Sequence, residues 1–204
     1  MLKQSFINLL KSYTSDTNLV HKYWHELEEA YSQKGRHYHT LAHLENMLVE
    51  LNNIKTEIQD WDTVLFSLYY HDAVYNVLKS DNEEQSADLA QKRMQAIGVP
   101  THIIDTCHTQ IIATKKHTLS DNTDTNYFTD ADLSVLGKDP ETYTLYTQQV
   151  RKEYSIYPDL LYKPGRKKVL RHFLDMERIF KTDYFFNKYE SAAKKNLQKE
   201  LETL

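Results

Sequence analysis

The chain of 204 residues has few of the residues that break helices or cross-link a fold. Glycine and proline number four each, which favours helices over many tight turns. Cys107 is the only cysteine, so an internal disulfide is excluded and a reducing compartment is consistent with the composition. The first residues lack the apolar run of a signal peptide, and no stretch approaches the length of a membrane span. We therefore expect a soluble, cytoplasmic protein that does not associate with a membrane.

An excess of charge of one sign is also lacking. The net charge is −4 with histidine neutral, so the chain has no basic excess and no nucleic-acid polymer is expected as a partner. The length suits one domain with a substantial core, and no repeat, low-complexity tract or linker divides it. We expect residues 1–204 to form a single domain. The pattern leaves the oligomeric state open, and a homo-oligomer through the last helix is one alternative.

Apolar residues recur at helical spacing nearly everywhere, and the strict alternation typical of strands is absent. Asp139-Pro140 is typical of a helix start, and Asp81 with Glu84 is typical of a capping box. Residues 118–127 are expected to form a polar loop, and the last two helices are expected near 165–180 and 186–203. The sequence therefore predicts an all-α helical bundle of about nine to ten helices.

Pairs of side chains with an imidazole or a carboxylate occur at three places in these apolar helices. They are His39 and His43, then His71-Asp72, then Asp130 and Asp132. A mixed nitrogen and oxygen donor set suits a divalent cation that holds a water and an anionic oxygen at once. Histidines four apart share one face of a helix, but an isolated pair is as often satisfied by hydrogen bonds. His71-Asp72 follows an apolar run, where an aspartate needs either a cation or solvent at the helix end.

Asp130 and Asp132 compete for the last ligand position. Two residues on a helix are separated by about 200°, so only one of them should face the ion. We choose Asp130, with Phe128 on the opposite side against the core. Asp132 is then expected to support a ligand or to interact with the helix start.

These residues resemble the motif of the HD superfamily of metal-dependent phosphohydrolases, which are all-α proteins named for a His-Asp pair. The order His43, His71-Asp72, Asp130 is similar to that motif, and the resemblance implies that these four residues bind the metal. A less studied branch of the superfamily is similar over most of the chain. The segments that carry this likeness are residues 36–43, 70–76, 81–87, 130–133 and 150–154.

The segment from Tyr38 to His43 also resembles the Tyr-His-Asn-Trp-x-His opening of the cyclic-nucleotide phosphodiesterases, with Thr40-Leu41 in place of Asn-Trp. The resemblance implies that His43 is a ligand and that His39 is a general acid that protonates the leaving oxygen. Together with Asp72, His39 is the expected catalytic residue.

Further polar residues are candidates for supporting roles. Some relatives hold a second metal with two histidines in the interval that here contains His108 and His117; the alternative is that both are surface or structural. Lys115 and Arg151 are candidates for binding phosphate, although exposed lysines at a helix end are common. Glu83 or Glu84 is a candidate for orienting a ligand histidine, or for no more than a helix start.

The expected function is hydrolysis of a small phosphate ester, a nucleotide among the candidates, by a metal-activated water. Two alternatives remain open: a non-catalytic module that binds metal and nucleotide, and a di-iron oxygenase. The donor set leaves manganese, iron, cobalt, nickel, zinc and magnesium open and argues against calcium.

Overall fold

The computed structural model describes residues 1–204 and is helical throughout, with ten α-helices, two short 3-10 helices and no strand. The predicted all-α fold is confirmed, and the count lies within the expected nine to ten helices. None of the helices combines the length and the apolar character needed to cross a lipid bilayer. The helices group into two compact units, residues 1–129 and 130–204, which are described separately. That they make a single domain stays a prediction.

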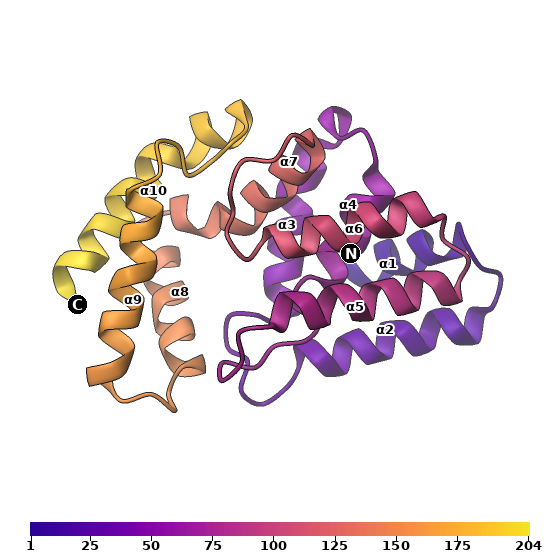
Figure 1. Cartoon of the computed structure of the whole chain (residues 1–204), viewed down its shortest axis with the longest axis horizontal. Coiled ribbons are helices and arrows are strands. Elements are labelled where there is room, and N and C mark those ends of the chain that lie inside the picture. Colours follow the sequence, from indigo (N-terminus) through magenta and orange to yellow (C-terminus); the bar gives the residue numbers. More distant parts are fainter. The chain divides into compact units, whose positions relative to one another are not determined.

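The first unit contains most of the helices (Figure 1). They are α1 (Leu2–Lys11), α2 (Thr17–Tyr31), α3 (Leu41–Asn53), η1 (Lys55–Glu57), α4 (Trp61–Tyr70), α5 (Asn82–Ala96), α6 (Thr101–Ala113) and the first part of α7 (Thr123–Leu133). The boundary between the units falls inside α7, which is one unbroken helix.

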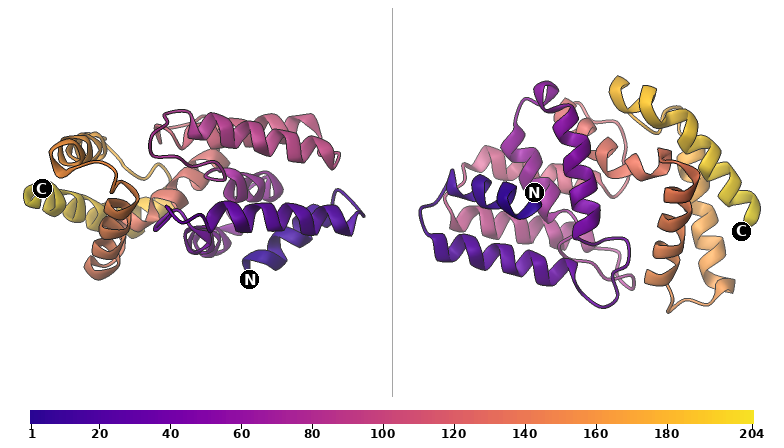
Figure 2. Two further views of the ribbon diagram at one scale, coloured as in Figure 1. Left: turned by 90° about the horizontal axis from the view of Figure 1, so that it is seen from below. Right: turned by 180° about the vertical axis from the view of Figure 1, so that it is seen from behind.

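Helix α4 is the centre of the first unit. Its last eight residues, 63 to 70, are all buried, as expected for a helix that is apolar on every side. Helices α1, α3, α5 and α6 pack against it, and α5 and α6 lie side by side (Figures 1 and 2). Phe6 of α1 meets the edge of the Tyr69 ring at 4.9 Å between centroids. This packing fixes the end of α4, where His71 and Asp72 follow.

The second unit contains η2 (Ser134–Gly137), α8 (Pro140–Glu153), α9 (Asp159–Leu174) and α10 (Asp183–Thr203) (Figure 2). Helix α10 packs against η2 and α9. The predicted helix start at Asp139-Pro140 is confirmed, because Asp139 accepts hydrogen bonds from the backbone of residues 141 and 142. Arg166 of α9 and Glu200 of α10 form a buried two-pronged ion pair, with N–O distances of 2.7 and 2.9 Å.

Three local expectations are corrected by the structure. Residues 123–127 belong to α7 rather than to a loop, and α9 begins at Asp159 rather than near 165. Asp81 precedes α5 but its side chain makes no capping bond, so the capping box does not form. Polar side chains in these segments are compatible with helix and loop alike, and tertiary contacts decide between them.

Candidate metal centre

His71 follows the last residue of α4, and its ring is held in one tautomer. The side chain is 1% exposed. Its Nδ1 lies 3.0 Å from the backbone oxygen of Leu68, and since a carbonyl can only accept, Nδ1 carries the proton. In the neutral imidazole the lone pair of His71 is then on Nε2, which is the state that a metal ligand needs.

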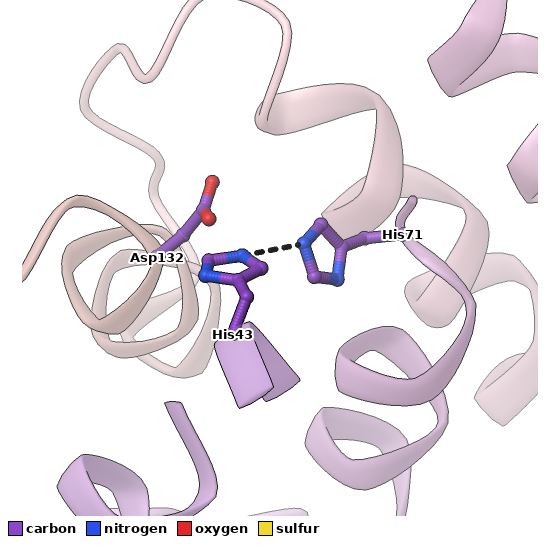
Figure 3. Close-up of side chains that lie close together, drawn as sticks. All are labelled: His43, His71 and Asp132. Atoms are coloured by element: carbon purple, nitrogen blue, oxygen red, sulfur yellow. Dashed lines mark hydrogen bonds between the residues drawn. The ribbon is translucent and has the colours of Figure 1, made fainter. Parts of the chain in front are cut away.

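His43 lies in the first turn of α3 and points its ring at His71 (Figure 3). The Nε2 atoms of the two buried imidazoles are 3.3 Å apart. Two nitrogens bound to one ion at about 2.0–2.1 Å would be separated by about 2.9–3.4 Å, depending on whether the geometry is octahedral or tetrahedral. The observed separation fits a shared ion. It also fits a hydrogen bond from His43 Nε2–H to His71 Nε2.

Asp132 of α7 completes a group of three. Ligand atoms of His43, His71 and Asp132 all lie within 4.8 Å of one another (Figure 3). Phe128, one turn earlier on the same helix, has its ring 5.8 Å from that of His71 and nearly perpendicular to it. Because residues four apart share a helix face, the contact that directs Phe128 toward His71 also directs Asp132 there.

Asp72 lies beside this group. Its Oδ2 is 3.2 Å from His71 Nε2, so the nitrogen that faces His43 also faces this carboxylate. Two imidazoles and the Asp132 carboxylate thus approach one another from three separate helices or helix ends, and the Asp72 carboxylate lies beside His71. Such a set suits a first-row divalent cation or magnesium, and it does not single one out.

The structure reverses the choice between Asp130 and Asp132. Asp130 is fully buried and accepts hydrogen bonds from Lys181 N, Thr182 N and Thr182 Oγ1 at 3.0, 2.8 and 2.8 Å. The Lys181 ammonium adds an ion pair at 3.1 Å. Asp130 thus anchors the segment before α10, and Asp132 is the carboxylate that α7 presents to the histidines. The expectation assumed that Phe128 points away from the metal centre. Its ring instead contacts His71, so the centre lies on the helix face that Phe128 shares with Asp132.

His39 lies near the group but not on the helix of His43. Helix α3 begins at Leu41, so His39 belongs to the preceding loop, which corrects the expectation of two histidines on one helix. Its Nε2 is 3.9 Å from Asp72 Oδ2, and its ring is 6.0 Å from that of His43. The ring contacts Tyr38 and Tyr75, at 5.0 and 4.4 Å between centroids.

Lys115 pairs with the two glutamates that were candidates for orienting a ligand histidine. Its Nζ donates to Glu84 Oε1 at 2.5 Å and to Ser80 O at 2.6 Å, and it lies 3.8 Å from Glu83 Oε2. The hydrogen bond lowers the pKa of Glu84 and raises that of Lys115. Lys115, Glu83 and Glu84 therefore stabilise the turn before α5, and neither expected role is supported.

Arg151 is likewise engaged within its own unit. The guanidinium donates to Asp159 Oδ1 at 2.8 Å and to the backbone oxygens of Tyr154 and Tyr157, and it stacks over the Tyr162 ring at 4.5 Å. These contacts hold the connection between α8 and α9. The expectation that Arg151 binds phosphate is not supported.

His108 and His117 do not belong to the group of His43, His71 and Asp132. His108 on α6 has its Nε2 3.9 Å from Asp88 Oδ1 on α5, in a partly exposed pair. His117 follows the end of α6 in the left-handed region, at φ 53°, with its N–H bonded to Ala113 O. Nothing in this arrangement favours a second metal over the structural alternative.

Two residues that contact the turn of His71 and Asp72 escaped the sequence-based selection. Arg36 and Tyr31 bind the backbone on either side of Asp72. Arg36 is the first residue of the segment 36–43 that carries the resemblance, and that position is the signal in the sequence that could have found it. Nothing in a helical pattern distinguishes Tyr31 from the other tyrosines of the chain.

The chain matches none of the protein-family models, curated proteins or solved structures with which it was compared. The likeness to the HD superfamily therefore stays a prediction, and an argument about function rests on the geometry of the site.

Proposed function

We propose that this chain is a metal-dependent phosphohydrolase that acts on a small phosphate ester, with nucleotides among the candidate substrates. The observation that carries the proposal is the approach of three donors to one another, from His43, His71 and Asp132, with the Asp72 carboxylate beside His71 Nε2. These groups fit a divalent cation by type and by spacing.

His43, His71, Asp72 and Asp132 would hold the cation, and four protein ligands leave positions for substrate and water on an ion that accepts six. A bound ion of this kind polarises a phosphoryl oxygen and lowers the pKa of water from 15.7 toward about 7 in the best zinc sites. The fixed tautomer of His71 supports this role, because its Nε2 needs no proton transfer before it binds.

His39 is the candidate proton donor to the leaving oxygen. Its Nε2 lies 3.9 Å from Asp72 Oδ2 and its ring lies 6.0 Å from that of His43, so it would hold a proton beside the metal centre rather than bind the ion. The rings of Tyr38 and Tyr75 limit the orientations open to the imidazole. Asp72 would then have two tasks, as a ligand and as the carboxylate that faces the His39 imidazole.

One observation favours the alternative of a module that binds metal and nucleotide without turnover. A phosphohydrolase usually offsets the charge that builds on the equatorial oxygens with a cation near the metal. Both cations selected for that role, Lys115 and Arg151, are held in ion pairs with carboxylates of the chain. The di-iron oxygenase requires His108 and His117 as ligands and receives no such support.

The test is elemental analysis of gently purified protein, followed by phosphate release from a nucleotide panel with added Mn²⁺. We expect about one metal ion per chain and metal-dependent turnover, both lost in Asp72→Ala. Asp88→Ala is the matched control, because it removes a carboxylate that also lies near a histidine but outside the site. Metal without turnover on any phosphate ester would favour the binding module. Retention of both metal and turnover in Asp72→Ala would refute the proposal.

A further inference from the structure

Arg36 is buried in the first unit and joins two segments of the candidate metal centre. It is 6% exposed. Its Nη1 donates to His39 O at 3.2 Å and to Asp72 O at 2.6 Å, and its Nη2 donates to Ala73 O at 3.0 Å. One guanidinium therefore ties the loop of His39 to the turn of Asp72.

Tyr31 holds the same turn from the other side. The Asp72 N–H donates to Tyr31 Oη at 3.2 Å, and that hydroxyl donates to Tyr69 O at 3.1 Å. The Tyr31 ring also stacks on the Arg36 guanidinium at 4.9 Å. The two peptide groups that flank the α-carbon of Asp72 are thus both fixed, the N–H by Tyr31 and the C=O by Arg36. Fixing both peptides fixes the direction in which the Asp72 side chain leaves the backbone.

Burying the Arg36 guanidinium lowers the stability of the fold. Its hydrogen-bond partners are all backbone carbonyls, and its buried Nε makes no hydrogen bond. Burying a charge that pairs with no carboxylate costs free energy, which the ring faces of Tyr31 and Tyr75 offset only in part. A buried charge without an ionic partner is expected mainly where the residue has a functional role, such as positioning another side chain.

We propose that Arg36, together with Tyr31, is a positioning residue of the metal centre: it fixes the backbone around Asp72 so that this carboxylate and His71 Nε2 face one ion. The effect on metal binding rests on the proposed function. The fixing of the turn does not, since it is a property of the metal-free chain.

The main test replaces Arg36 with lysine, which keeps the charge and loses the planar fork. Titration with Mn²⁺ and with Zn²⁺ should show affinity lower by about 10–100-fold, the usual effect of losing a group that orients a ligand. Hydrogen exchange on the metal-free protein should be faster for the amides of residues 71–76, with the amides of the second unit unchanged.

Arg93→Lys is the matched control. Arg93 also forms a two-pronged contact, with Glu26 at 2.7 and 2.5 Å, and also lies over a tyrosine ring, that of Tyr23 at 5.3 Å. It contacts neither His39 nor the turn of Asp72. A general loss of stability from replacing an arginine should appear in both variants. Because Arg93 does not contact the turn of Asp72, Arg93→Lys should leave metal affinity and exchange at residues 71–76 unchanged.

Tyr31→Phe keeps the test decisive if Arg36→Lys does not fold. It removes only the hydroxyl, which accepts from Asp72 N–H and donates to Tyr69 O. We expect metal affinity lower by about fivefold, the equivalent of the one hydrogen bond to the Asp72 N–H, with faster exchange at residues 71–76. Wild-type affinity and exchange in the folded variants would overturn the inference and leave hydrolysis by the wild type standing. A wild type that binds no metal would refute the proposed function, while faster exchange in the variants would still support the positioning of the turn.

Discussion

Asp130 and Asp132 stand two residues apart on α7 and should respond oppositely to the same substitution. We expect Asp132→Asn to abolish tight metal binding and to leave the metal-free fold intact. We expect Asp130→Asn to weaken the fold and to leave metal affinity near that of the wild type. Asparagine matches aspartate in size, so each change removes a charge without opening a cavity.

The magnitudes follow from the partners of each carboxylate. Asp130 accepts three hydrogen bonds, and Lys181, itself buried, faces it as an ion pair. Burial already lowers the pKa of Lys181, and the Asp130 carboxylate opposes that shift. Removing one partner of a buried pair costs about 3–5 kcal/mol, a large part of the about 5–15 kcal/mol that stabilises a typical domain. Asp132→Asn should cost less than this without metal, because Asp132 is only partly buried and its charge acts on Lys181 more weakly than that of Asp130.

The assay combines urea unfolding of metal-free protein, followed by circular dichroism, with metal affinity from competition against a chromophoric chelator. Metal at 100 times its dissociation constant should add about 2.7 kcal/mol to the free energy of unfolding of the wild type and of Asp130→Asn. It should add nothing to that of Asp132→Asn. If Asp132→Asn kept its affinity while Asp130→Asn lost it, the assignment of these two carboxylates would be wrong.

Three further outcomes are expected. Burial raises the pKa of the Cys107 thiol to about 12, so a disulfide reagent at mildly alkaline pH should label no thiol in the native chain and one after denaturation; rapid labelling of the native chain would contradict this. Burial raises the pKa of Tyr70 above its ordinary 10.0, so the contribution of this group to the free energy of unfolding is fully present below pH 10 and decreases above it, where only the unfolded chain releases the proton; ionisation of all tyrosines with helicity and stability unchanged would contradict it. Gly137→Ala should cost about 1–3 kcal/mol or more in denaturant unfolding, because a Cβ there would lie 2.5 Å from Tyr189 Cβ. Gly165→Ala, which meets nothing within 4 Å, is the control and should not destabilise.

The helical pattern and the ends of particular helices could be predicted from the sequence because they depend on local chemistry. Asp139-Pro140 begins α8 as expected, and His71-Asp72 follows the apolar run of α4. The approach of His43 to His71 is expected from the donor types together with the resemblance to a known motif, and not from helical spacing. Each of these inferences uses residues whose preferred environment is strongly restricted.

The choice between Asp130 and Asp132 could not be made in this way. It depends on Lys181 and Thr182, about fifty residues further along the chain, whose N–H groups bind Asp130. The sequence likewise shows the charge of a lysine or arginine but not its partner. Arg151 is therefore a candidate for binding phosphate by its sequence, whereas in the structure it pairs with Asp159. Helical periodicity gives relative directions around one axis, and the absolute direction is set by contacts from elsewhere.

The end of α4 gives the candidate centre a further property. In an uninterrupted helix the N–H of Asp72 would bond to the carbonyl of Leu68, but here it turns to Tyr31 and the same carbonyl receives the imidazole of His71. The length of α4 and the position of the proton on the His71 imidazole are therefore coupled through the carbonyl of Leu68. A substitution that let α4 continue by one residue would bring a second donor to this carbonyl and weaken the hydrogen bond that keeps the proton on His71 Nδ1. Insertions and deletions near residue 70 should consequently change the chemistry of the centre even where they leave every donor in place.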